Sequence, residues 1–104
     1  MIKDFDIGAA EVAQNWVTNS SQRFRDTHVE INMPPIVDTP ETKGVFIELK
    51  RGAKALSIHV WSVGHFQTEL LNEQRGEVQV QYEQIASAEE VVPLLEKAYA
   101  NAFP

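Results

Sequence analysis

The stretch GVFIELKRGAKALSIHVWSVGHFQTELLNEQRGEVQVQYEQI, residues 44–85, decides the fold of this 104-residue chain. Glycines recur at positions 44, 52, 64 and 76, and short β-rich runs lie between and after them. The runs are GVFIELK, ALSIHVW, FQTELL and EVQVQYEQI, and the segments RGAK, SVGH and NEQRG supply turn residues. This spacing predicts an antiparallel β-meander.

An amphipathic helix is predicted before the meander. Apolar residues recur at steps of three and four over residues 5–24, which places them on one stripe of a helix. Asp4 or Asp6 suits the N-terminal end of this helix, and Arg23 and Arg25 suit its C-terminal end. The stripe consists of Phe5, Ala9, Val12, Ala13, Trp16, Val17, Ser20 and Phe24.

A second helix is predicted after the meander. Ser87 and Glu90 form an S-x-x-E capping box, and an apolar stripe follows it. Pro93 falls one turn into this helix and should shift its start or bend it. The stripe consists of Val91, Leu94, Leu95, Ala98, Tyr99 and Ala102.

The segment between the first helix and the meander holds one more strand and a loop. THVEINM alternates with period two, and PPIVDTPETKG carries three prolines among turn formers. The chain, residues 1–104, is therefore expected to be a single α+β domain. Its antiparallel meander of four to five strands should have the N- and C-terminal helices packed on one face.

Composition narrows the class of function. The net charge is −6 with a pI near 4.9, which argues against nucleic-acid binding and suits a basic protein partner. Cysteine is absent, so thiol nucleophiles, disulfides and zinc–thiolate sites are excluded. The sequence carries no apolar secretory signal and no apolar run of membrane-spanning length. We expect a cytoplasmic protein.

Alternation also assigns the two faces of the predicted sheet. The face expected to lie against the helices carries Val45, Ile47, Leu49, Leu56, Ile58, Val60, Phe66, Thr68, Leu70, Val78, Val80 and Tyr82. The opposite face carries Phe46, Glu48, Lys50, Ser57, His59, Trp61, Gln67, Glu69, Leu71, Glu77, Gln79, Gln81 and Glu83. Phe46, Trp61 and Leu71 are out of place on such a polar face.

Three explanations for these exposed apolar side chains stay open. The N-terminal helix or the proline loop could cover them as a satellite core. They could instead form an aromatic and acidic recognition patch, since tryptophan is the commonest hot-spot residue of interfaces. A different strand register is the third. The candidate partner-binding residues are Phe46, Glu48, His59, Trp61, Glu69 and Leu71.

Enzyme chemistry is the weaker interpretation. His59, His65 and Glu69 are the one cluster that could bind a metal or move protons, but His65 is expected in the turn, out of line with the other two. The sequence has no G-x-S-x-G, G-x-G-x-x-G or P-loop motif. We therefore expect no catalytic residues, no metal and no cofactor.

Residues 60–103 resemble the TriTu-like bacterial immunity proteins. The pattern in that family is a strand ending in Trp, a Ser/Gly turn, an acidic-apolar strand, a Gly-Glu turn, a Val- and Glu-rich strand and a Ser-capped helix. The matching residues are Trp61, Ser62, Gly64, Thr68, Glu69, Leu70, Arg75, Gly76, Glu77, the run 78–83, Ser87 and Glu90. Two departures are Val63, inserted between Ser and Gly, and His65 in a place where the family favours an acidic residue.

The resemblance implies an antidote used in interbacterial competition. Such a protein would bind a cognate toxin domain of the Rhs, contact-dependent or type VI secretion kind, an ADP-ribosyltransferase, as a heterodimer. It would block the active site or the substrate surface of the toxin. The alternatives are a small acidic secretion adaptor or chaperone, and a small enzyme that uses His59 or His65.

Overall fold

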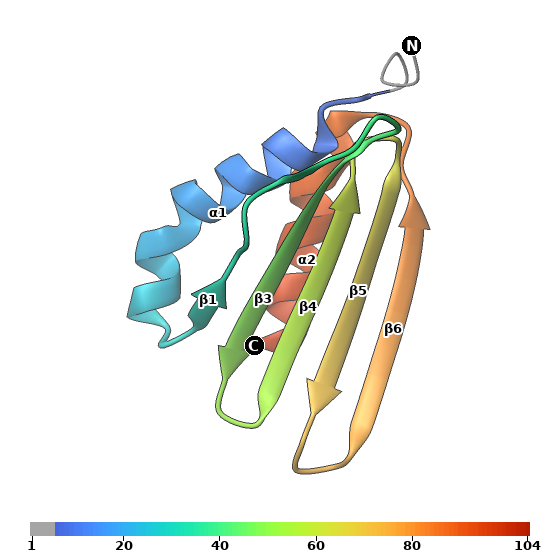
Figure 1. The fold of residues 1–104 in the computed structure, drawn as a ribbon. Helices are drawn as coiled ribbons and strands as arrows, with labels where there is room; N and C mark the ends of the chain where they lie inside the picture. Colours follow the sequence, from blue (N-terminus) through green and yellow to red (C-terminus); the bar gives the residue numbers. More distant parts are fainter. Residues whose placement is uncertain (1–5) are drawn as a thin grey trace.

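The predicted α+β fold is confirmed by a computed structural model, which describes residues 6–104 (Figure 1). The elements are α1 (Ala9–Asp26), β1 (Glu30–Asn32), β2 (Val37–Asp38), β3 (Lys43–Arg51), β4 (Lys54–Trp61), β5 (His65–Asn72), β6 (Glu77–Gln84), the 3-10 turn η2 (Ala88–Glu90) and α2 (Val91–Ala102). The sheet order is β1-β3-β4-β5-β6, β2 also pairs with β3, and every pairing is antiparallel. The meander predicted for residues 44–85 is therefore β3 to β6.

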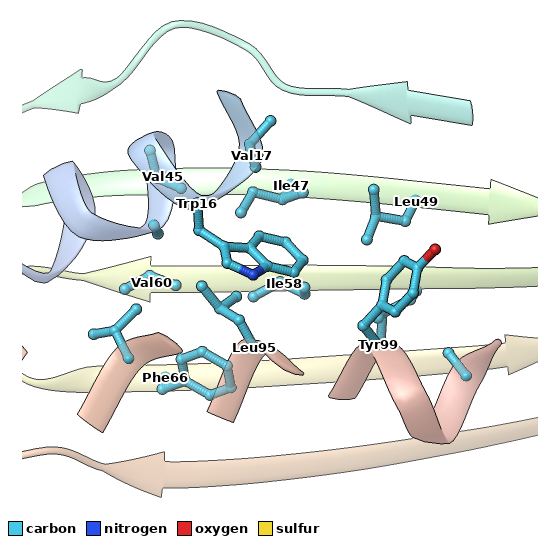
Figure 2. Close-up of a cluster of buried hydrophobic side chains, with 14 of the residues drawn as sticks. Trp16, Val17, Val45, Ile47, Leu49, Ile58, Val60, Phe66, Leu95 and Tyr99 are labelled. Atoms are coloured by element: carbon cyan, nitrogen blue, oxygen red, sulfur yellow. The ribbon is translucent and has the colours of Figure 1, made fainter. Parts of the chain in front are cut away.

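Both helices pack on one face of the sheet and close the core there. α1 lies against β3 and β4, and α2 lies against β4 and β5 (Figure 1). Figure 2 shows Trp16 of α1 and Leu95 of α2 above the apolar side chains of the middle strands. The buried apolar side chains of the sheet are Val45, Ile47, Leu49, Leu56, Ile58, Val60 and Phe66, and Thr68 is buried beside them, as alternation predicts.

Ser62, in the turn between β4 and β5, binds the first turn of α1. The predicted helix start at Phe5 lies outside the described residues, as does Asp4, and α1 begins at Ala9 after Gly8. Asp6 accepts a hydrogen bond of 2.7 Å from the Gly8 N–H. The buried Ser62 Oγ accepts a hydrogen bond of 2.9 Å from the Ala10 N–H. A hydroxyl of the β4–β5 turn therefore caps the N-terminal end of α1.

Gly64 completes that turn in a conformation that only glycine adopts without strain. Its φ is +114°, and a Cβ there would lie 2.6 Å from the Ile85 carbonyl oxygen. The Gly64 carbonyl accepts a 2.8 Å hydrogen bond from the Ile85 N–H. The close approach joins the β4–β5 turn to the residue that follows β6.

The predicted face of β6 is wrong. Leu71 pairs with Val78, Glu69 with Val80 and Gln67 with Tyr82. Because directly paired side chains project from the same side of a sheet, Val78, Val80 and Tyr82 point away from the helices. Instead, the helix side of β6 carries Gln79, Gln81 and Glu83. The four-residue loop 73–76 between β5 and β6 sets this register, and a shift of one residue exchanges the two faces.

Three smaller expectations also change. The strand predicted over THVEINM is reduced to β1, and Pro34 and Pro35 follow it. The predicted proline loop contains the two-residue strand β2. The capping box of Ser87 and Glu90 is present, but it opens the turn η2, and α2 then accommodates Pro93 in its first turn.

Glu96 of α2 joins the two helices. Arg23 donates two hydrogen bonds of 2.8 Å to its carboxylate, and the indole N–H of Trp16 donates a third of 2.6 Å. These bonds, chiefly those from Arg23, hold the pKa of Glu96 below its ordinary value of 4.5. The anionic form is therefore favoured by folding.

A Glu96→Gln variant tests this linkage. Because the folded pKa is lowered, the stabilisation is present above the unfolded pKa of 4.5 and is lost as the pH falls through the folded pKa. Both side chains of the ion pair are more than a third exposed, so the loss at pH 7 should be only about 1 kcal/mol. Urea unfolding at pH 7 and pH 3 should show a difference that shrinks in acid. An equal difference at both pH values, or the same pattern in Glu89→Gln, would contradict it.

Candidate protein-binding interface

The face of the sheet turned away from both helices, here called the outer face, carries all six candidate residues. Its side chains form cross-strand rows over β3, β4, β5 and β6. The rows are Gly44–Trp61–His65–Gln84, Phe46–His59–Gln67–Tyr82, Glu48–Ser57–Glu69–Val80 and Lys50–Ala55–Leu71–Val78. The predicted set therefore shares one surface.

An aromatic cluster occupies one end of the outer face. The ring of Trp61 lies edge-on to Phe46 with centroids 5.4 Å apart, and Phe46 lies 4.9 Å from His59. A Cβ on Gly44 would be 2.4 Å from the Trp61 ring, so the indole lies directly over the main chain of its paired residue. Because Gly44 has no Cβ, the Trp61 ring can pack directly on its main chain, and the ring shields that main chain from solvent.

His65 and Tyr82 form a second aromatic pair on the same face. Their ring centroids are 5.7 Å apart, and His65 Nδ1 shares a hydrogen bond with the Tyr82 hydroxyl. His65 is the first residue of β5 and pairs with Trp61, so the expectation that it lies in the turn is wrong. It extends the aromatic surface toward β6.

Val78, Val80 and Tyr82 are the residues that the sequence analysis missed. Their side chains are 60%, 57% and 56% exposed, whereas Phe46, Trp61 and Leu71 are half-buried. These six apolar side chains, Phe46, Trp61, Leu71, Val78, Val80 and Tyr82, are called the outer patch below. The helices lie on the opposite face and do not cover it. Of the proline loop, Val37 pairs with Gly44 beside Trp61, and Pro34 and Phe46 border a hollow of about 100 Å³.

Acidic charge is concentrated at the β6 side of the sheet. Residues 69–90 contain six glutamates and one arginine, a net charge of −5 out of the −6 of the whole chain. Glu48 and Glu69 are exposed on the outer face itself. A basic partner would therefore meet the outer patch in a favourable field.

The histidines and Glu69 do not converge. His59 pairs with Gln67, and Glu69 pairs with Ser57, while His65 contacts Tyr82. Within residues 6–104, no three histidine, aspartate or glutamate side chains are grouped as metal ligands would be. The expectation that the protein needs no metal stays a prediction, to be checked by metal analysis of the purified protein.

Comparison of the chain with known protein families, curated proteins and solved structures finds no match. The resemblance of residues 60–103 to TriTu-like immunity proteins therefore stays a prediction. Among residues 6–104, no helix combines the length and apolar character needed to cross a bilayer.

Proposed function

We propose that the protein is a cytoplasmic immunity protein that neutralises a cognate interbacterial toxin domain by binding it through the outer face. The observation that carries the proposal is the outer patch, an aromatic and aliphatic surface on the side of the sheet turned away from the core, in which Val78, Val80 and Tyr82 are exposed. A protein that inhibits by occlusion needs such a surface and needs no catalytic centre of its own.

The composition of the outer patch supports protein binding. Protein interfaces are enriched in tryptophan, tyrosine and phenylalanine, and hot spots gather near the centre of the patch. Trp61 and Phe46 are held against each other, and Tyr82 is held by His65, so their ordering on binding costs little conformational entropy. The patch is preorganised for a rigid partner.

The charge of the sheet indicates the class of partner. A toxin domain that handles nucleic acid or an anionic cofactor carries a basic surface, and the glutamates around the outer patch would steer it. The TriTu-like resemblance adds that the toxin would be an ADP-ribosyltransferase. An acidic secretion adaptor is the second candidate, because it would use the same patch for an exported client.

Charge reversal at the outer face tests the proposal. A toxin domain encoded beside the gene for this chain would be the partner to test. It should bind, and Glu69→Lys should slow association about tenfold at low salt and less at high salt. The control is Asp26→Lys, which makes the same change in net charge at the exposed C-terminal end of α1. Stopped-flow association kinetics measure both. A toxin domain that does not bind, or equal slowing by both variants, would contradict the proposal.

A further inference from the structure

The main-chain edge of β6 is a second feature that the proposed function does not use. Within residues 6–104, β6 pairs with β5 alone, and Figure 1 shows no element beyond it. All eight of its residues are exposed. An unpaired strand edge presents a row of N–H and C=O groups that can take up another strand.

The register defines which groups point outward. The Ile85 N–H donates to the Gly64 carbonyl, across from it in the β5–β6 ladder. Because the groups of successive residues in an antiparallel strand alternate between its two edges, the odd-numbered residues of β6 bond to β5. The N–H and C=O groups of Val78, Val80, Tyr82 and Gln84 therefore point away from the sheet.

This edge has few of the features that natural proteins use to block strand addition. EVQVQYEQ contains no proline, lysine or arginine, and its eight residues pair with β5 in unbroken register. The two glutamates, Glu77 and Glu83, are its only charged residues. They oppose a second copy of this acidic chain and favour a basic strand.

Side chains on both faces of β6 suit an alternating partner. On the outer face Val78, Val80 and Tyr82 would meet apolar side chains. On the helix side, Gln79, Gln81 and Glu83 form one wall of a groove of about 200 Å³. Its apolar lining, which includes Phe66, Leu70 and Leu94, can cover the methylene stem of a lysine or arginine. Lys97 also lines the groove, so the cationic head must lie toward Glu83 and away from Lys97.

We propose that β6 binds a basic extended segment of another protein, which adds to the sheet as a further strand. The segment alternates apolar residues, on the outer face, with lysine or arginine on the helix side. Main-chain bonds to Val78, Val80, Tyr82 and Gln84 give affinity, and the alternating side chains give specificity. The inference does not depend on the toxin proposed above.

Selection of peptides tests this directly. Random linear peptides of about twelve residues, displayed on phage, are selected against the wild-type protein, and the enriched peptides should alternate apolar and basic residues. Val80→Pro removes one outward N–H and leaves the bonds to β5 in place, so it should weaken the best synthetic peptide about tenfold. Val80→Thr retains the N–H and should stay within about threefold. Asn19→Ala, at an exposed position of α1, should leave peptide binding unchanged.

Amide hydrogen exchange in the wild-type protein gives a readout that does not depend on the folding of Val80→Pro. The free protein should exchange the amides of Val80 and Tyr82 faster than those of Gln79 and Gln81, and the peptide should slow the first pair about tenfold or more. Enriched peptides without alternation, equal affinity for Val80→Pro, or unprotected edge amides in the complex would overturn the proposal. A wild-type dimer that Val80→Pro dissociates would also overturn it, because a second copy would then occupy the edge.

Discussion

Truncation of Phe24 to alanine is expected to lower the free energy of unfolding by about 3–5 kcal/mol. The ring is 1% exposed and lies at the centre of an aromatic cluster, 5.5 Å from Trp16 and 5.6 Å from Tyr99. Its removal would leave a cavity between the two helices that these large rings cannot refill. A domain of this size has a total stability of about 5–15 kcal/mol, so the loss is a large share of it.

The measurement is urea unfolding followed by tryptophan fluorescence, with Asn19→Ala as the control. Asn19 is exposed on the same helix, and its replacement should change stability by no more than about 0.5 kcal/mol. A loss below about 1 kcal/mol in Phe24→Ala would show that the helix–helix contact does not hold the core together as its burial indicates.

The strands and the core face of β3, β4 and β5 could be predicted because the sequence there alternates strongly. Apolar side chains alternate with polar ones over three consecutive runs, and only one choice of face buries Val45, Ile58 and Phe66 together. The helices were predictable for the same reason, since their stripes repeat every three to four residues.

β6 could not be placed from alternation, because its pattern fits either face. Val78, Val80 and Tyr82 alternate with glutamine and glutamate as a core strand would, so alternation alone predicts that the apolar set faces the core. The deciding information lies in the loop, which pairs Asn72 with Glu77 and so matches even-numbered residues of one strand with odd-numbered residues of the other. The length of the β5–β6 loop is therefore the sequence feature from which the outward direction of Val78, Val80 and Tyr82 could be predicted.

Long-range contacts also lay beyond the sequence pattern. Nothing local predicts that Ser62 caps a helix that begins more than fifty residues earlier, or that Trp61 covers Gly44. The outward direction of Trp61 was predictable from alternation, and it is confirmed. Its neighbours on the outer face, such as Tyr82, could be predicted only with the register of the whole sheet.

The surroundings of Trp61 bear on the satellite-core explanation for its position. The helices do not supply such a core, because both lie on the opposite face, whereas the proline loop reaches the same face at Val37, which pairs with Gly44. The contacts of the ring are with Gly44 and Phe46, within the sheet. The side chain is half-buried on the outer face, and its exposed part is where we expect a partner to bind.

Trp61→Ala is expected to weaken binding of the toxin domain by about 2–4 kcal/mol while the fold survives. The affinity loss should be large because tryptophan is enriched among the hot spots of protein interfaces. The stability loss should be about 1 kcal/mol, or a few degrees in melting temperature, because the indole lies outside the main core and its ring packs on Gly44 and Phe46. Val92→Ala, which removes an exposed apolar side chain from α2, is the matched control and should change neither quantity much.

Calorimetric titration measures the affinity of Trp61→Ala for the toxin domain, and thermal melting measures its stability separately. A marked fall in melting temperature with unchanged affinity of the folded fraction would assign Trp61 to the structure and leave the outer face without its anchor.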